Sequence, residues 1–213
     1  MAKQTSVINK IAYFQGRRDE LPNQRLAEEL CGAKNRTGIK EIAENLRNEN
    51  PNIQADCLKV LYEIGYKEPR LIANCVDDFL GLLQSRNNRL VWGAMIGLST
   101  IALLQSEAIG QHVDQIIETM KKGSVITIDN GVSILASVAS KESGPRKRAM
   151  SFLFNHLKTC RPKDVPQHSE RMMVAINGEN KAEFGRVLNS RLKEFSQSQL
   201  KRVQKVLLLA EGK

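Results

Sequence analysis

The sequence is poor in large aromatic rings and in cysteine. Only 5% of its 213 residues are aromatic, and Trp92 is the single tryptophan. So few rings leave little material for an aromatic-lined ligand pocket or for stacking on nucleic-acid bases. The four cysteines stand far apart without a CxxC pair: Cys31, Cys57, Cys75 and Cys160. We therefore expect reduced thiols, with no disulfide framework and no Cys/His cluster at metal-ligand spacing.

A long apolar run is also missing. The longest uncharged stretch, residues 90–106, is interrupted by glycines and polar side chains, whereas a membrane span needs about 20 strongly apolar residues. We expect this stretch to form a buried helix. Residues 1–20 lack the apolar core and small-residue cleavage site of a secretory signal. The sequence therefore predicts no transmembrane segment and a cytoplasmic location.

Familiar catalytic signatures are absent as well. The chain has no HExxH, no GxSxG and no glycine-rich phosphate loop. Its three histidines, His112, His156 and His168, are expected to lie in separate units as surface or half-buried helix residues. We predict a non-enzymatic protein with no cofactor and no metal.

What the sequence does contain is an internal period of 37 residues. Apolar residues recur at this step, and within each unit they fall at positions i, i+3, i+4 and i+7, which is one face of an α-helix. The four sets are Ile39, Val76, Val113 and Met150; Ile42, Phe79, Ile116 and Leu153; Ala43, Leu80, Ile117 and Phe154; Leu46, Leu83, Met120 and Leu157.

A second apolar pattern follows the same step later in each unit. Its sets are Leu58, Met95 and Val132; Leu61, Leu98, Leu135 and Met172; Ile64, Ile101, Val138 and Ala175. Two helices in every repeat indicate that units stack on their neighbours. The predicted fold is therefore all-α, an α-α superhelix or solenoid of about five to six helix pairs.

The period also sets the predicted boundaries. One domain is expected over residues 1–213, with an N-terminal cap at 1–37, four repeats within 38–179 and a C-terminal capping repeat at 180–213. Asn- and Pro-rich turns such as 48–52 separate the helices of a pair. The β-branched run 125–128 is expected to lie near a helix start. The last helix is expected to bury Val203, Val206, Leu207 and Leu209.

The helix pairs, the period and the Asn/Pro turns resemble the HEAT and armadillo repeat class. HEAT repeats often carry an aspartate in the turn and a basic residue in the second helix, but here Lys59 is matched by Ser133 two repeats on. The chain is similar in fold to alkylpurine DNA glycosylases, which hold a damaged nucleotide with tryptophans around an acidic residue. Trp92 is followed by residues 93–96 without an acid, so that resemblance stops at the fold.

Charge is unevenly divided along the chain. Residues 1–120 contain 14 Lys/Arg and 15 Asp/Glu, whereas residues 121–213 contain 18 and 8. A basic half suggests an acidic partner. Turns of successive repeats should stack along one edge, which predicts a basic ridge of Arg47, Arg86, Arg89, Lys121, Lys122, Lys158, Arg161 and Lys163. Such cations can contact phosphate, or merely complement helix C-termini and keep the surface hydrated.

Two further candidate surfaces follow from the repeat register. Arg146, Lys147 and Arg148 open a helix, where like charges oppose the helix dipole unless an anion binds there. This cluster is a candidate anion site. The exposed side of the second helices is a candidate concave face for a helix or extended peptide; its residues include Tyr62, Ser99, Thr100 and Met173.

The sequence therefore favours a non-catalytic repeat scaffold that binds another macromolecule, with a protein or acidic peptide as the preferred partner. The alternative is a nucleic-acid-binding solenoid, as in DNA repair or processing, that uses its basic C-terminal half. The sequence leaves the partner's identity and the oligomeric state open.

Overall fold

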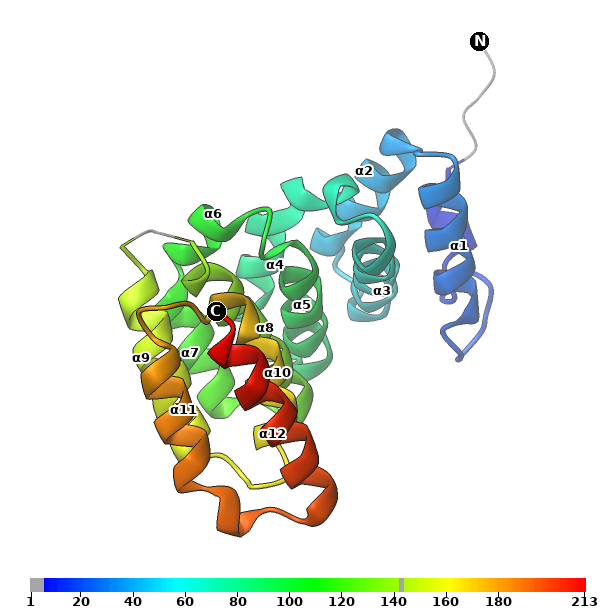
Figure 1. Cartoon of the computed structure of the whole chain (residues 1–213). Helices are drawn as coiled ribbons and strands as arrows, with labels where there is room; N and C mark the ends of the chain where they lie inside the picture. Colours follow the sequence, from blue (N-terminus) through cyan, green and yellow to red (C-terminus); the bar gives the residue numbers. More distant parts are fainter. Residues whose placement is uncertain (1–5, 142–143) are drawn as a thin grey trace. The chain divides into compact units, whose positions relative to one another are not determined.

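The computed structural model describes residues 6–141 and 144–213, and within them every regular element is helical. Residues 1–5 of the predicted N-terminal cap and residues 142–143 of the third repeat lie outside the described residues. The α-helices are α1 Leu21–Gly32, α2 Arg36–Glu44, α3 Pro51–Lys67, α4 Val76–Leu82, α5 Asn88–Ile101, α6 Ser106–Gly110, α7 Val113–Lys122, α8 Val125–Ala139, α9 Arg146–Thr159, α10 Val165–Met172, α11 Lys181–Ser190 and α12 Gln197–Glu211 (Figure 1).

The helices can be assigned in pairs to the predicted repeats, although α2 begins at Arg36, inside the predicted cap, and the repeat bounds stay a prediction. The four full repeats contain α2 and α3, α4 and α5, α7 and α8, and α9 and α10, and the C-terminal capping repeat contains α11 and α12. The all-α repeat fold is confirmed. The β-branched run at Val125 begins α8 as expected. Short 3-10 turns link several helices, among them Pro69–Leu71 and Ala73–Cys75 between α3 and α4.

Polar side chains in the turns explain where the helices begin. Asn50 accepts a hydrogen bond from the backbone N–H of Asn52, and Pro51 occupies the first helical position of α3, where its missing N–H costs nothing. Asn87 caps α5 in the same way. Ser196 forms a reciprocal capping box with Gln199 at the start of α12. The Asn-rich turns seen in the sequence therefore supply N-caps at which the following helices begin.

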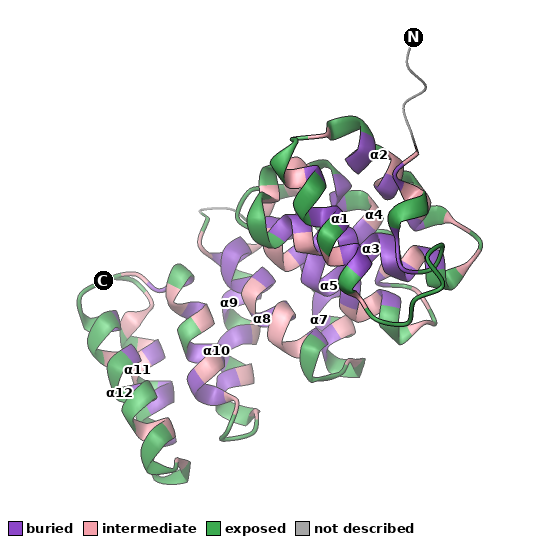
Figure 2. Cartoon of the chain, turned by 90° about the vertical axis from the view of Figure 1, so that its right-hand side faces the viewer, coloured by how far each residue is buried: buried purple, intermediate pink, exposed green. Residues whose placement is uncertain are grey.

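The periodic apolar residues form the core. Ile42, Phe79, Ile116 and Leu153, one from each first helix, are all 0% exposed. The second-helix sets are equally buried, and Figure 2 shows the helices with a buried face and an exposed face. Burying such a stripe against neighbouring helices is the main source of stability for helices of this length.

The chain divides into two compact units. Unit 1 contains residues 1–105 and 122–127, and unit 2 contains residues 106–121 and 128–213. Within unit 1, α3 packs against both α1 and α5; within unit 2, α9 packs against α10 and α11, and α12 packs against α10 and α11. Whether residues 1–213 form one domain depends on how the two units join, so the assignment of a single domain stays a prediction.

The ends differ from expectation in detail. The segment before α1 contains only a 3-10 turn, Ile8–Lys10, and Gly16 has a φ of 63° that ends this segment. Leu209 was expected in the core but is 55% exposed. That expectation is wrong because the buried stripe of α12 runs through Val203, Val206 and Ala210, and Leu209 falls outside it.

Among the helices in the described part of the chain, none combines the length and the apolar character that crossing a lipid bilayer requires.

Candidate binding grooves and a histidine cluster

A groove of about 550 Å³ runs between α9 and α11, which lie side by side in unit 2 (Figure 1). Cations stand at both ends of α9, an apolar floor lies between them, and acids and amides complete the walls. The lining residues are Arg146, Lys147, Met150, Ser151, Phe154, Asn155, Lys158, Glu179, Asn180 and Glu183.

Two of the three cations form ion pairs across this groove. Arg146 lies 3.0 Å from Glu179, and Lys158 lies 4.0 Å from Glu183. Lys147 is exposed and forms no ion pair with another described residue. The Lys158–Glu183 pair is exposed at both ends, and such pairs contribute little to stability, so Lys158 can exchange partners readily. The Arg146 side chain is half-buried.

This groove unites two predictions made separately from the sequence. Arg146 and Lys147 come from the candidate anion site and Lys158 from the basic ridge, and all three line one surface. Arg148, the third member of the anion site, lies elsewhere, because its guanidinium pairs with Asp114 on α7 at 2.8 Å. Arg146 begins α9 as the sequence predicts, with no side-chain cap ahead of it.

The other ridge cations are exposed, and several are neutralised locally. The ion pairs are Arg47 with Asp78, Arg89 with Asp56, Lys121 with Glu118 and Arg161 with Asp164. Arg86, Lys122 and Lys163 are exposed without an ion pair to another described residue. The ridge draws on both units, so a continuous ridge stays a prediction.

A second groove, of about 580 Å³, lies between α2 and α4 in unit 1. Its lining residues are Arg36, Ile39, Lys40, Ala43, Glu44, Arg47, Leu71, Asn74, Cys75 and Asp78. The α2 residues stand three repeat steps, or 111 residues, before their counterparts on α9. Arg36 thus corresponds to Lys147 and Arg47 to Lys158. The same repeat position therefore builds a cation-flanked groove in each unit.

The predicted concave face needs one correction. Tyr62 is only 6% exposed, and burial raises its pKa to about 12. The ammonium group of Lys59 lies 4.9 Å from the centre of its ring. Tyr62 therefore belongs to the packed interior, and the expectation that it is accessible is wrong.

The other three residues of this face are half-buried. The hydroxyls of Ser99 and Thr100 donate to carbonyls of their own helix. Met173 lies in the 3-10 turn after α10. As a binding surface, this face stays a prediction.

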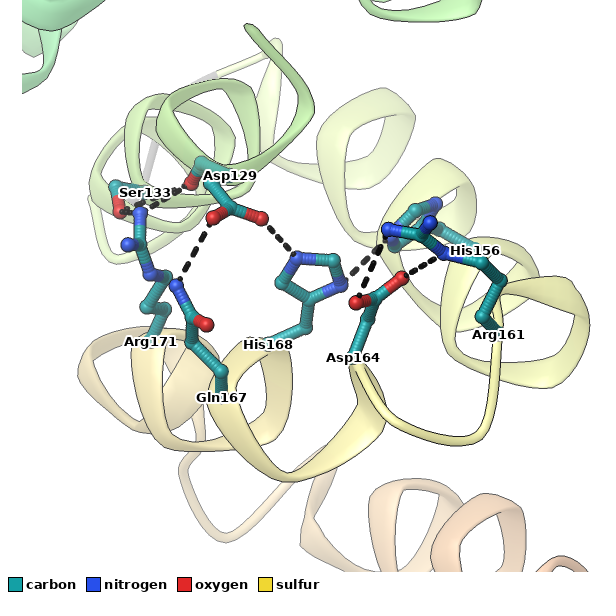
Figure 3. Close-up of polar contacts among 8 residues, drawn as sticks. All are labelled: Asp129, Ser133, His156, Arg161, Asp164, Gln167, His168 and Arg171. Carbon is teal, nitrogen blue, oxygen red and sulfur yellow. Dashed lines mark hydrogen bonds and ion pairs between the residues drawn. The ribbon is translucent and has the colours of Figure 1, made fainter. Parts of the chain in front are cut away.

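A polar cluster lies between α8, α9 and α10 of unit 2 (Figure 3). The imidazole of His168 is 1% exposed, and its Nε2 stands 2.9 Å from a carboxylate oxygen of Asp129. Its Nδ1 stands 3.0 Å from Nε2 of His156. Because a carboxylate only accepts, Nε2 of a neutral His168 carries the proton and Nδ1 presents a lone pair to His156.

The Asp129 side of this cluster is held by two more residues. Gln167 donates to the second carboxylate oxygen at 3.1 Å. Arg171 donates to the Asp129 carbonyl and, at 2.9 Å, to the hydroxyl of Ser133. These contacts hold the Asp129 carboxylate in the orientation in which it accepts the hydrogen bond from His168.

Cys160 joins the two histidines. It lies one helical turn after His156, and the ligand atoms of His156, Cys160 and His168 all lie within 4.8 Å of one another. Burial is the main cause that lowers the pKa of His156, to about 4, with His168 adding to it; burial also raises the pKa of the Cys160 thiol. His156 is therefore a neutral imidazole at pH 7.

This cluster corrects two expectations from the sequence. A Cys/His cluster at ligand distance does exist, and His156 and His168 lie in the same repeat, on its paired helices. The signal available in the sequence was the one-turn spacing of His156 and Cys160 on a predicted helix, because residues four apart share a helix face.

No protein-family model matches the chain, and no curated protein matches it. Solved structures of similar fold include designed and engineered proteins. An engineered protein from the Northeast Structural Genomics Consortium has a TM-score of 0.67 and 15% identity, with 98% of each chain covered. A designed armadillo repeat protein has a TM-score of 0.67 and 12% identity, covering 88% of this chain and 87% of that one.

A further designed armadillo repeat protein was solved in complex with peptide (KR)4. It has a TM-score of 0.67 and 14% identity, covering 88% of this chain and 86% of that one. At these identities the likeness establishes the armadillo-type α-solenoid fold and leaves the partner to be argued from the grooves themselves.

Proposed function

We propose that this chain is a non-catalytic repeat scaffold whose partner is a protein, and that an acidic segment of that partner binds in the α9/α11 groove. The observation that carries the proposal is the convergence of Arg146, Lys147 and Lys158 on one groove with an apolar floor. A cytoplasmic location stays part of this prediction.

The groove matches the chemistry of a peptide. Lys147 is free to meet a carboxylate, and Met150 and Phe154 form a floor for apolar side chains. The exposed amide of Asn155 offers a donor and an acceptor, as a peptide backbone requires. The amide of Asn180 is already used within its own turn, where it accepts from the backbone N–H of Asn177 and donates to the carbonyl of Ala175. Because residues 121–213 carry ten more Lys/Arg than Asp/Glu, the surrounding field also attracts an acidic segment.

A nucleic acid suits this groove less well. Duplex DNA carries one negative charge per ~1.7 Å of axis, and Glu179 and Glu183 stand among the groove cations, where they would repel a continuous line of phosphates. An acidic peptide can place its carboxylates beside the cations and neutral residues beside the glutamates. The basic C-terminal half keeps nucleic acid as the alternative that the experiment must test.

The structural comparisons support the general part of the proposal. A designed repeat protein of this fold was solved with a bound peptide, so the architecture suits a peptide-binding scaffold. The charge of that peptide is a property of its own complex and is not transferred to this chain.

The test compares three labelled ligands by fluorescence anisotropy: an Asp/Glu-rich peptide with interspersed leucines, its Lys/Arg counterpart and a short DNA duplex. We expect the acidic peptide to bind best. The double variant Lys147→Glu/Lys158→Glu should weaken it at least tenfold, while the matched variant Lys193→Glu/Lys201→Glu, which changes exposed lysines outside the groove, should change it less than twofold.

Three outcomes contradict the proposal. Tighter binding of the duplex, with a steep loss as salt rises, would favour the nucleic-acid alternative. Acidic-peptide binding that survives the groove variant would place the site elsewhere. A failure to bind any of the three ligands would argue against a charged partner altogether.

A further inference from the structure

The histidine cluster of unit 2 has features that a purely structural hydrogen-bond network does not require. Asp129 alone satisfies one nitrogen of His168, which is 1% exposed. The other nitrogen faces a second imidazole, and a thiol lies within reach of both. Three different donor groups thus converge on one point from two helices.

We propose that His156, Cys160 and His168 form a metal site that takes a zinc-like divalent cation. Two imidazoles and one thiolate are the donor set that Zn²⁺ and Co²⁺ accept in tetrahedral sites, with a water molecule free to take the fourth position. This proposal is independent of the peptide groove, which lies between α9 and α11.

The distances fit that coordination closely. Two nitrogens bound to one tetrahedral zinc ion stand roughly 3.3 Å apart, and Nε2 of His156 and Nδ1 of His168 are 3.0 Å apart. A thiolate and an imidazole on the same ion stand roughly 3.6 Å apart, and the Cys160 sulfur lies within 4.8 Å of both nitrogens. Closing the site therefore asks for about 1 Å of side-chain movement.

Asp129 is the positioning residue of this site. It accepts the proton on Nε2 of His168, which fixes the tautomer that turns the Nδ1 lone pair inward. Gln167 and Arg171 hold Asp129 in turn. A carboxylate behind a ligating histidine raises the basicity of the imidazole, and losing such a partner commonly costs 10–100-fold in metal affinity.

The charges around the site can accommodate a divalent ion. Arg191 donates to the Cys160 sulfur at 3.9 Å, which favours the thiolate, and its own charge is matched by Glu194 at 2.5 Å. Asp164 is paired with Arg161 beside the cluster. The thiolate, Asp129 and Asp164 therefore supply the negative charge around the metal.

The test titrates Co²⁺ alone into the full-length protein after treatment with a chelator and a reductant. We expect one ion per chain with a thiolate-to-cobalt charge-transfer absorption that Zn²⁺ abolishes by displacement. Cys160→Ser should remove that absorption, and Cys31→Ser, which changes a half-buried thiol in unit 1, should leave it intact. His156→Gln should weaken binding at least tenfold.

Asp129→Asn tests whether Asp129 acts on the metal through His168, because a residue with a structural role alone would not change the Co²⁺ affinity. We expect 10–100-fold weaker Co²⁺ binding, with the metal-free thermal transition recorded as the check on folding. The proposal is overturned if no charge-transfer band forms, if the band persists in Cys160→Ser, or if Co²⁺ affinity is the same in His156→Gln as in the parent protein.

Discussion

The α2/α4 groove of unit 1 and the α9/α11 groove of unit 2 are built at the same repeat position but differ in what fills them. Both have cations on either side of the groove floor: Arg36 on α2 and Arg47 in the 3-10 turn after it, and Lys147 and Lys158 on α9. Between these cations the side chains diverge. The repeat therefore determines where the groove and its flanking cations lie, and the residues between these cations determine which ligand the groove prefers.

The largest local difference lies in the floor. Phe154 in the α9/α11 groove corresponds to Ala43 in the α2/α4 groove, and Asn155 corresponds to Glu44. The unit 2 groove is thus floored by a ring and lined by a neutral amide, whereas the unit 1 groove has a small residue and an acid. These differences favour an acidic, partly apolar peptide in the α9/α11 groove.

The surrounding charge adds to this contrast. Residues 1–120 have nearly balanced charges, while residues 121–213 have 18 Lys/Arg and 8 Asp/Glu. Two grooves with similar cations therefore lie in different electrostatic fields, and the field governs how fast a charged partner arrives.

The strongest effect is expected from removing the groove floor. Phe154 is 6% exposed, so Phe154→Ala should cost about 3 kcal/mol of unfolding free energy, because the ring leaves a cavity that its neighbours fill only in part. Urea unfolding measures this loss as a lower midpoint. Phe154→Leu should recover more than half of it.

The opposite change at the equivalent position tests whether the floors differ as described. Ala43 is half-buried and lines open groove space, so Ala43→Phe should change the unfolding free energy by less than about 1 kcal/mol. A destabilisation as large as that of Phe154→Ala would mean that Ala43 is closely packed and that the comparison of floors fails.

The next effect concerns the groove cations. Arg36→Glu/Arg47→Glu in unit 1 should weaken the Asp/Glu-rich peptide less than threefold, while Lys147→Glu/Lys158→Glu in unit 2 should weaken it at least tenfold, or about 1.4 kcal/mol. The reason is that only the unit 2 cations lie in a basic surrounding. Anisotropy titrations at low and high salt measure both, and equal losses would show that the grooves are interchangeable.

Much of the fold was predictable because burial in a repeat protein follows a fixed step. Ile42, Phe79, Ile116 and Leu153 share one environment, so their spacing alone identified the first helices. The N-terminal cap was less predictable, since no neighbouring repeat fixes its register. It buries apolar residues such as Ile11 and Leu30, but polar contacts also hold it, because the buried side chains of Asn23 and Asp56 accept from the backbone N–H groups of Ala12 and Tyr13.

The candidate sites were predictable only in pieces. Arg146 and Lys158 were assigned to different surfaces because Arg146 opens a helix and Lys158 lies beside the turn that follows it. At 1.5 Å per residue they stand about 18 Å apart along α9, and they line one groove. The histidine cluster was missed because pairing across α9 and α10 brings His168 beside His156, and residue spacing does not show that contact.

The two units should also differ, by a smaller amount, in how low pH affects their folding stability. Burial alone would raise the pKa of Glu41 on α2, but hydrogen bonds from Ser6 and from the backbone of Val7 and Ile8 hold it below its usual value. The folded state therefore gains stability that is present above about pH 4.5 and is lost as pH falls through the folded pKa.

Glu41→Gln should remove roughly 0.5 kcal/mol at pH 7 and flatten the stability profile between pH 5 and pH 3. The equivalent residue three steps on is Phe152, which carries no charge, so α9 has no counterpart of this carboxylate. Thermal unfolding across this pH range measures both, and an unchanged profile in Glu41→Gln would show that the carboxylate does not hold the N-terminal turn.

The smallest effect should come from giving the α2/α4 groove the neutral side chains of its counterpart. Lys40 and Glu44 form a 3.8 Å ion pair on α2, and the corresponding α9 residues are Ser151 and Asn155. Lys40→Ser/Glu44→Asn leaves the net charge unchanged but removes one acid from the groove wall, while Arg47 keeps its pair with Asp78. It should therefore strengthen acidic-peptide binding by about twofold, or 0.4 kcal/mol. This gain is measured in the Lys147→Glu/Lys158→Glu background, where the unit 2 groove is silenced. A gain of tenfold would mean that local side chains outweigh the surrounding field, because the field of unit 1 stays the same in both proteins.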